Sequence, residues 1–296
     1  MTSKGTLAVL ACGTMGTAIL SGVMESQRAM QEGANIPVES ESGHPVLPER
    51  YIVTVGRPTT AKRLKSMFES AGHDHVEVHT QENVVAAREA DFVLLCCKPQ
   101  RVGEFLSEEG MRDALKNKIV VSIAAGVTIS KLQKYLDAST KVVRAMPNTP
   151  SKIREGMTVI SNVDTLSQDE RDLLCSIFSA VGRCHFLDEK LFDAATALAG
   201  SGPAFVTLFL EAMTDGGVMM GLPRPEALEL AAQTMQGAAR MVLQSGTHPA
   251  AIKDSVTTPG GCTIAGLLQM EDGRLRSTVA RSIQTAAEHA AGLGKD

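Results

Sequence analysis

Short, continuous apolar runs recur along residues 6–187, and each ends at a glycine, proline or polar turn. Such runs are typical of strands that are buried on both faces, as in a parallel sheet. They predict strands over residues 6–12, 51–55, 76–79, 92–97, 119–123, 141–145, 157–160 and 184–187. Helical spacing of apolar residues predicts intervening helices over residues 15–30, 60–71, 83–90, 129–136 and 169–181. This alternation indicates βαβ units in a doubly wound α/β sheet.

The pattern changes after Asp188, where no convincing strand follows and Ala, Leu and Met become abundant. Helices are predicted over residues 191–198, 204–220, 225–243 and 264–291. Several are apolar around most of their surface, and such helices need to be buried. We therefore predict a domain with the sheet at residues 1–188 and an all-helical domain at residues 189–296. A homo-oligomer would bury the excess apolar surface.

Composition and charge exclude some functions. Apolar residues make up 44% of the chain and charged residues 21%, which is an ordinary globular balance. A net charge of -4 and an aromatic content of 3% argue against a nucleic-acid partner. Residues 31–50 are rich in Gly, Pro, Ser and Glu, so we expect an exposed loop insertion there.

The six cysteines show neither a C-x-x-C pair nor a spacing that suits a metal. Most lie in apolar runs, so we interpret them as free thiols in a reducing compartment. The apolar stretch near the N-terminus is short and broken by glycine, unlike a secretory signal, and no membrane-spanning run is evident. We expect a cytoplasmic protein with no membrane partner.

The first predicted strand leads into a turn that resembles the dinucleotide-binding pattern G-x-G-x-x-G of Rossmann-type domains, with Ala11 in place of the first glycine. Gly13 would let the backbone approach a pyrophosphate, and Gly16 would let the following helix pack closely on the strand. The phosphates would lie at the helix N-terminus, where free N–H groups favour anions. The predicted cofactor-binding residues of this turn are Ala11, Gly13, Thr14, Met15 and Gly16.

The end of the second strand bears on the choice of cofactor. NAD-binding domains usually place an acidic residue there, whereas this chain has Arg57, followed by Thr59 and Thr60. A guanidinium can pair with a 2′-phosphate through two parallel bonds, so NADP(H) is favoured and NADH is the alternative. Two further strand ends, at Lys98 and at residues 124–125, would lie at the same edge of the sheet.

Two segments of the second half suit a small ligand. Residues 256–264 form a turn with two glycines before a helix, where N–H groups can converge on a carboxylate and where Thr258 or Thr263 could cap the helix. Residues 196–204 interrupt a helical pattern with small residues, which permit close approach of a ligand or of another helix. For each segment the alternative is an ordinary structural turn or packing contact.

Several motifs together resemble the pyrroline-5-carboxylate reductase family, in its order and spacing. They are LACGTMGTAI, CCKPQ, SIAAGVTI, VRAMPNTP, ALAGSGPAFV, GLPR and VTTPGGCTIAGL. The resemblance implies reduction of 1-pyrroline-5-carboxylate to L-proline by NAD(P)H, the last step of proline biosynthesis. It also implies an interlocked homodimer, assembled in some members into a larger ring.

The same resemblance assigns roles to individual residues. The substrate carboxylate would meet the turn at Thr258, Gly260, Gly261 and Cys262, Thr263 would hydrogen-bond the ring nitrogen as the catalytic residue, and Thr196 would line the pocket. The cofactor matches are Gly13, Thr14, Met15, Arg57, Asn83, Lys98, Ala124 and Ala125.

Two alternatives remain open at this point. A β-hydroxyacid dehydrogenase-like reductase would place a lysine after a Gly-Ser-Gly-like turn, but no lysine occurs between Lys190 and Lys253. A non-catalytic NADP-binding sensor would not need the Thr-Pro-Gly-Gly-x-Thr turn. A small-molecule imino acid is therefore the expected substrate.

Overall fold

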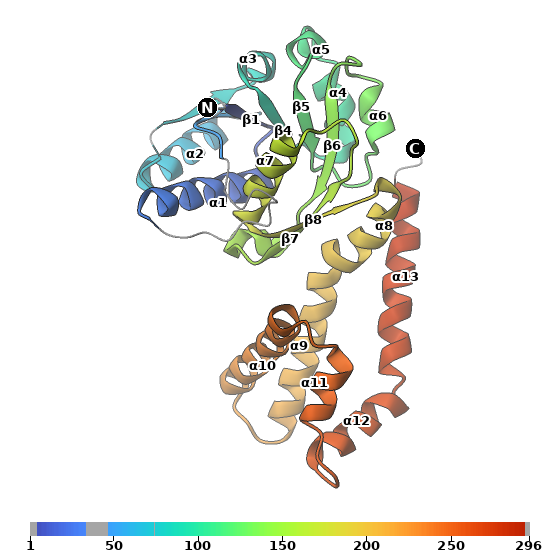
Figure 1. The fold of residues 1–296 in the computed structure, drawn as a ribbon. Helices are drawn as coiled ribbons and strands as arrows, with labels where there is room; N and C mark the ends of the chain where they lie inside the picture. The colour runs from blue at the N-terminus through green and yellow to red at the C-terminus, as the bar shows by residue number, and fades with distance from the viewer. Residues whose placement is uncertain (1–4, 34–46, 74, 294–296) are drawn as a thin grey trace. The chain divides into compact units, whose positions relative to one another are not determined.

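The computed structural model describes residues 5–33, 47–73 and 75–293 (Figure 1). Most of the predicted loop insertion, residues 34–46, lies outside the described residues. The chain divides into two compact units, Met1–Gly200 with Ala287–Asp296, and Ser201–Ala286. They are called the sheet unit and the helical unit below.

Within the described residues, one eight-stranded sheet forms in the order β3-β2-β1-β4-β5-β6-β7-β8. The strands are β1 (Thr6–Leu10), β2 (Arg50–Val55), β3 (Val76–Thr80), β4 (Phe92–Leu95), β5 (Ile119–Ser122), β6 (Lys141–Met146), β7 (Gly156–Ser161) and β8 (Gly182–Leu187). Strands β1 to β6 run parallel, β7 pairs antiparallel with β6, and β8 is parallel to β7. The first six strands have the Rossmann order, in which ligands bind at the carboxyl ends where the strand order reverses.

Helices cover both faces of this sheet, as the alternating pattern predicts (Figure 1). They are α1 (Thr14–Gln31), α2 (Pro58–Ser70), α3 (Asn83–Glu89), η1 (Pro99–Arg101), α4 (Val102–Leu106), α5 (Met111–Ala114), α6 (Ile129–Gln133), η2 (Thr149–Ile153) and α7 (Gln168–Ser179). Local sequence fixes where several begin. Pro58 opens α2, where its missing N–H does no harm, and a capping box of Ser167 and Glu170 opens α7.

Some details differ from the sequence prediction. The strand predicted over residues 6–12 ends at Leu10, because Ala11 turns the chain with a φ of 55°. Helices α4 and α5 were not predicted, since each spans little more than one turn and shows no apolar period. The reversal of β7 was also not predicted, because an apolar run does not encode strand direction.

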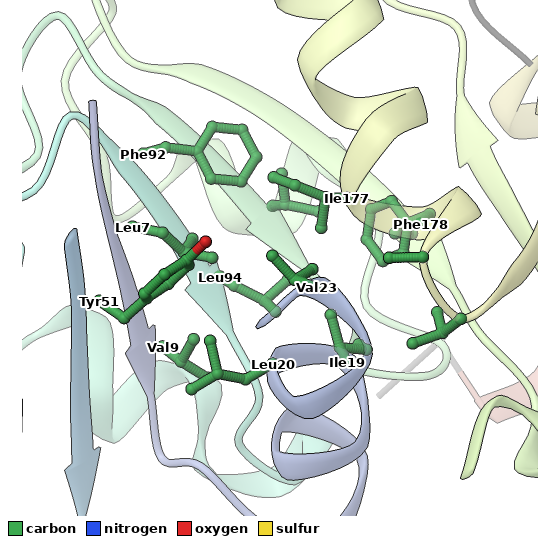
Figure 2. Packing of buried hydrophobic residues seen from close by; sticks show 14 of the residues in the cluster. Leu7, Val9, Ile19, Leu20, Val23, Tyr51, Phe92, Leu94, Ile177 and Phe178 are labelled. Atoms are coloured by element: carbon green, nitrogen blue, oxygen red, sulfur yellow. The ribbon is translucent and has the colours of Figure 1, made fainter. Parts of the chain in front are cut away.

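Alternate residues of β1 enter two separate hydrophobic cores. Leu7 and Val9 pack on one face with residues of α1, α2 and α7, including Leu20 (Figure 2). Ala8 and Leu10 pack on the other face with residues of α3 to α6. A fully buried leucine contributes about 1.5–3 kcal/mol, so this strand is fixed firmly from both sides. The turn that follows it therefore starts from a rigid position.

Two buried hydroxyls in the described part of the sheet unit, those of Ser151 and Thr158, have no hydrogen-bond partner. Thr158 in β7 is 1% exposed, and its Oγ1 is unpaired. We expect Thr158→Val, which keeps the shape and removes the unpaired group, to raise the free energy of unfolding by about 1 kcal/mol in urea denaturation. Thr140 is the matched control, because its buried hydroxyl donates to the Leu115 carbonyl at 2.9 Å. Thr140→Val should lose stability, and equal losses in both variants would contradict the prediction.

The segment after β8 is helical throughout its regular structure. Its elements are η3 (Glu189–Leu191), α8 (Phe192–Ala195), the π-helical turn η4 (Thr196–Gly200), α9 (Gly202–Met219), α10 (Arg224–Ser245), α11 (Pro249–Ser255), α12 (Cys262–Asp272) and α13 (Leu275–Leu293). The single helix predicted over residues 264–291 is wrong. Arg274 adopts a φ of 55°, which ends α12 and starts a new helix. Helix α11 was not predicted either.

The helical unit has almost no core of its own. Within Ser201–Ala286, all of which is described, only Thr214, Ala227 and Ala231 are buried. Large apolar side chains are exposed instead, with Leu208 67% and Met219 82% exposed. Large apolar side chains exposed in this way are typical of a surface that an obligate interface covers. The sequence-based expectation of an oligomer rests on the same residues.

One helical stretch, Glu189–Met219, is long and apolar enough to cross a membrane by length and composition. Such a finding is weak on its own, because helices that pack against protein pass the same test. Only 6% of the most apolar part of this stretch is buried within the chain. Another molecule is therefore needed to bury its apolar side chains.

Candidate active site

The dinucleotide turn is held by the neighbouring strand. Ala11 has a φ of 55°, the left-handed region that a first glycine would adopt without strain. Its N–H donates to Oγ1 of Thr54 at 3.2 Å, and the N–H of Cys12 donates to the Thr54 carbonyl at 2.8 Å. Two bonds from one β2 residue thus keep the turn in this conformation.

Gly16 allows α1 to approach the strand closely. A Cβ at this position would lie 3.0 Å from Sγ of Cys96 and 3.1 Å from a methyl carbon of Val9. Any side chain would therefore push the helix away from β1 and β4. This close packing is the role that the sequence pattern predicts for the last glycine.

The start of α1 fits an anionic group. No side chain caps the helix, whose N-cap is Gly13, and its first turn contains no acidic residue. A Cβ at Gly13 would meet nothing closer than the Ala11 carbonyl oxygen at 4.0 Å, so the space beside the backbone is open. Free N–H groups beside an open glycine suit a pyrophosphate. The predicted binding residues Thr14 and Met15 begin this helix.

Two buried thiols near the ends of β1 and β4, those of Cys12 and Cys97, are poor nucleophiles. Burial raises the pKa of Cys12 to about 11 and that of Cys97 to about 11. Both thiols are neutral near pH 7, and all six cysteines are free, as the sequence predicts. Cys12 and Cys97 act as small apolar groups, one in each of the two hydrophobic cores beside the sheet.

The end of β2 presents a cation to solvent. Arg57 is exposed and is the N-cap of α2, and its guanidinium forms no hydrogen bond or ion pair with the rest of the described chain. Thr59 and Thr60 lie in the first turn of the same helix, which has no acidic residue. An unpaired guanidinium with adjacent hydroxyls and helix N–H groups fits a phosphate monoester.

Asn83 begins α3, which follows the neighbouring strand β3, and it is half-buried. Its Oδ1 accepts a hydrogen bond from Oγ1 of Thr54 at 2.7 Å. Its Nδ2 donates to Oε2 of Glu108 at 3.1 Å. Thr54 therefore contacts both the dinucleotide turn and Asn83.

The remaining predicted cofactor residues follow β4 and β5. Lys98 is exposed immediately before η1, Ala124 is buried, and Ala125 is exposed. The N–H of Ala124 donates to Oγ of Ser122 at 3.3 Å, which shapes the turn after β5. Because β1 to β5 are parallel, all the predicted cofactor residues share one edge of the sheet.

Thr196 begins the π-helical turn η4, which is anchored to the sheet. Its hydroxyl donates to Sδ of Met146 at 2.8 Å. Asn148 donates from Nδ2 to the Ala199 carbonyl at 3.0 Å and accepts from the N–H of Met157 at 2.8 Å. π-Helical turns are frequent at functional sites, since they redirect side chains from the regular helical path.

In the helical unit, the turn between α11 and α12 has the predicted form. Gly260 has a φ of 66°, and the N–H of Gly261 donates to the Thr258 carbonyl at 3.1 Å. A Cβ at Gly261 would lie 2.6 Å from Oγ1 of Thr258, so a side chain there would collide. Cys262 is exposed and Thr263 half-buried at the start of α12.

One expectation for this turn is wrong. Neither Thr258 nor Thr263 caps α12, because Gly261 occupies the N-cap position and no side chain bonds to the first turn. Consequently, no side chain accepts a hydrogen bond from the N–H groups at the start of α12. This makes the turn better suited to a carboxylate than a capped helix would be.

The predicted residues thus form three groups: the sheet edge, Thr196 in η4, and residues 258–263 of the helical unit. Sequence reasoning did not single out Thr54, Asn148 or Glu108. Thr54 could have been noticed as the one hydroxyl residue other than tyrosine in the apolar run of residues 51–55. Asn148 stands in the quoted VRAMPNTP motif, whereas nothing in the sequence pairs Glu108 with Asn83.

Comparisons with known proteins agree with this architecture. Residues 189–293 match the family model described as pyrroline-5-carboxylate reductase dimerisation. Residues 6–126 match the model described as NADP oxidoreductase coenzyme F420-dependent. Pyrroline-5-carboxylate reductase of Schizosaccharomyces pombe is 48% identical over 97% of this chain and 98% of its own length. The chain belongs to the pyrroline-5-carboxylate reductase family.

Other members of the pyrroline-5-carboxylate reductase family extend the similarity. The reductase of Lophium arboricola is 47% identical over 99% of this chain and 94% of its own length. The solved structure from Coxiella burnetii has a TM-score of 0.84 at 30% identity and covers 99% of this chain and 100% of its own. The Plasmodium falciparum pyrroline carboxylate reductase, solved with NADP bound, has a TM-score of 0.78 at 26% identity and covers 99% of each chain. The resemblance inferred from the motifs and the predicted fold class are both confirmed.

Proposed function

We propose that this chain reduces 1-pyrroline-5-carboxylate to L-proline with a hydride from NADPH, as the last step of proline biosynthesis. The observation that carries this proposal is the 48% identity to a pyrroline-5-carboxylate reductase along nearly the whole of both chains. The enzyme is an NAD(P)H-dependent oxidoreductase that acts on a small molecule. The geometry of the two units supports a role for each group of predicted residues.

On the cofactor side, the uncapped start of α1 would bind the pyrophosphate, with Ala11, Gly13, Thr14, Met15 and Gly16 shaping the turn. Arg57 would pair with the 2′-phosphate, which makes NADPH the preferred cofactor over NADH. Other side chains and turns of the same sheet edge would bind the rest of the dinucleotide. These are Asn83, Lys98, Ala124 and Ala125.

On the substrate side, the free N–H groups at the turn before α12 would bind the carboxylate of the imino acid. Thr258, Gly260, Gly261 and Cys262 form this turn. Each charge-assisted hydrogen bond is worth about 1.5–3 kcal/mol, so two or three would orient the ring firmly. Thr263 would hydrogen-bond the ring nitrogen, and Thr196 would line the pocket.

When bound, NADPH supplies a hydride to the carbon of the C=N bond. A protonated imine is the better acceptor, and solvent can supply that proton near neutral pH. The chain therefore needs mainly to orient the ring and to exclude water. This explains why no lysine or histidine base stands in the substrate motifs.

We further propose that residues 189–296 form the dimerisation and substrate-binding domain and residues 1–188 the NADP-binding domain. The dimerisation model matches 189–293, and the exposed apolar side chains of the helical unit would be covered by a second copy of the chain, not by lipid. Dimers would assemble into a larger ring in the cytoplasm, without nucleic acid. Light scattering should then give a mass above that of a dimer.

Oxidation of NADPH in the presence of pyrroline-5-carboxylate, followed by the absorbance of the reduced nicotinamide, tests the reaction. NADH in a parallel reaction tests the cofactor preference. Rapid oxidation that depends on the imine is the expected result. A folded protein that binds NADPH without oxidising it would favour the sensor, and oxidation with a β-hydroxyacid's keto form would favour the alternative reductase.

A further inference from the structure

Thr54 occupies an unusual place in the sheet unit. It lies in β2 and is 0% exposed, yet it makes polar contacts with two separate parts of the cofactor edge. Its carbonyl and its hydroxyl accept from Cys12 and Ala11, and the hydroxyl donates to Asn83. No other role in the sheet requires a hydroxyl at this buried position.

The directions of these hydrogen bonds follow from the groups involved. A backbone N–H can only donate, so Oγ1 of Thr54 must accept from Ala11, and its single proton is left for Asn83. The Glu108 carboxylate can only accept, so the Asn83 nitrogen faces Glu108 and the Asn83 atom that faces Thr54 is Oδ1. Thr54 and Glu108 together thus hold the Asn83 amide in one orientation.

The amide nitrogen so presented has two hydrogens. One is directed to Glu108 at 3.1 Å, and the second has no partner among the described residues. That second hydrogen can donate to a hydroxyl or phosphate oxygen of the cofactor. With the amide reversed, a carbonyl oxygen would face the Glu108 carboxylate and repel it.

We propose that Thr54 is a positioning residue for NADPH: its buried hydroxyl holds the pyrophosphate turn and the Asn83 amide in one fixed arrangement. The proposal deepens the proposed function and rests on it, since it concerns the same cofactor site. Ala11 makes the restraint necessary, because a left-handed alanine lacks the conformational ease of glycine. Removal of the hydroxyl breaks its bonds to Ala11 and to Asn83 at once, while the backbone bond from Cys12 to the Thr54 carbonyl remains.

The test compares Thr54→Val with Thr54→Ser, which keeps the hydroxyl, and with Thr158→Val. The last variant removes an equally buried hydroxyl that has no partner, in the same sheet unit. The dissociation constant of NADPH is measured by titration of nicotinamide fluorescence. For Thr54→Val we expect a rise of about tenfold, which corresponds to ~1.4 kcal/mol.

The other variants separate positioning from a general loss of structure. Thr54→Ser and Thr158→Val should bind NADPH like the unchanged chain. In Thr54→Val the KM for NADPH should rise while kcat at saturating NADPH stays the same. In an Asn83→Ala background, Thr54→Val should weaken NADPH binding less than it does alone, because the contact of the Thr54 hydroxyl with Asn83 is already lost.

Unchanged NADPH affinity in Thr54→Val would overturn the proposal and leave the reductase function untouched. Tight NADPH binding with no reduction of the imine would reject the reductase function alone. If the valine variant does not fold, Thr54→Cys replaces it, since a thiol fills similar space and hydrogen-bonds weakly. The NADPH affinity of Thr54→Cys should then be lower than that of Thr54→Ser. Equal NADPH affinities of these two variants would also overturn the proposal.

Discussion

Thr263→Ala is expected to lower kcat about 100-fold while leaving the affinity for NADPH unchanged, because the lost hydroxyl would act on the reacting imine and not on the cofactor. Thr263 is half-buried at the start of α12, and its hydroxyl has no partner among the described residues. It is therefore free to bond the ring nitrogen of a substrate whose carboxylate lies on the adjacent turn. Steady-state kinetics with saturating NADPH measures the effect.

Two variants control this experiment. Thr263→Ser keeps the hydroxyl and should retain most of the activity. Thr278 is an exposed threonine in α13, so Thr278→Ala removes a comparable group elsewhere in the helical unit and should not change kcat. Turnover of Thr263→Ala at the level of the Thr278 variant would rule out the proposed role of Thr263.

Arg57→Ala is expected to raise the dissociation constant of NADPH about 100-fold and to leave that of NADH nearly unchanged. A guanidinium can form two charge-assisted hydrogen bonds to a 2′-phosphate, each worth about 1.5–3 kcal/mol, and NADH has no phosphate there. Arg57 is exposed and its side chain has no partner in the described chain, so no native ion pair is broken by the change. The effect is thus assigned to the ligand.

Arg112 in α5 provides the matched control, because it is also an exposed arginine of the sheet unit. Arg112→Ala should bind both cofactors like the unchanged chain. Added salt should weaken NADPH binding to the unchanged chain more than to Arg57→Ala, since salt screens exposed charges. Equal losses for NADPH and NADH in Arg57→Ala would mean that this side chain does not recognise the 2′-phosphate.

The sheet was predictable because each strand is a compact apolar run that ends at a glycine, proline or polar residue. What escaped prediction depends on contacts between distant residues. The left-handed Ala11 is hydrogen-bonded to Thr54, and Asn83 is oriented by residues 54 and 108. The pairing of β7 with β6 and the break at Arg274 are likewise set by tertiary structure.

Some residues of the candidate site could be predicted from the sequence, whereas others depend on contacts between distant residues. Glycines at 13, 16, 260 and 261 are recognisable in sequence, because backbone approach and turns require them. The substrate itself was identified through the resemblance, since a glycine turn before a helix suits many anions. The anchoring of η4 by Met146 and Asn148 was invisible, because neither residue type at that spacing implies a contact with residues 196–199.

Because few side chains of the helical unit are buried within one chain, we expect folding of this unit to depend on association with another chain. The unfolding temperature of such a protein rises with its concentration, because association and folding are coupled. Dilution, as at low expression, would then deplete the folded form before any mutation does. Two variants of this chain produced together would also exchange subunits, so a defective copy can lower the activity of an intact one.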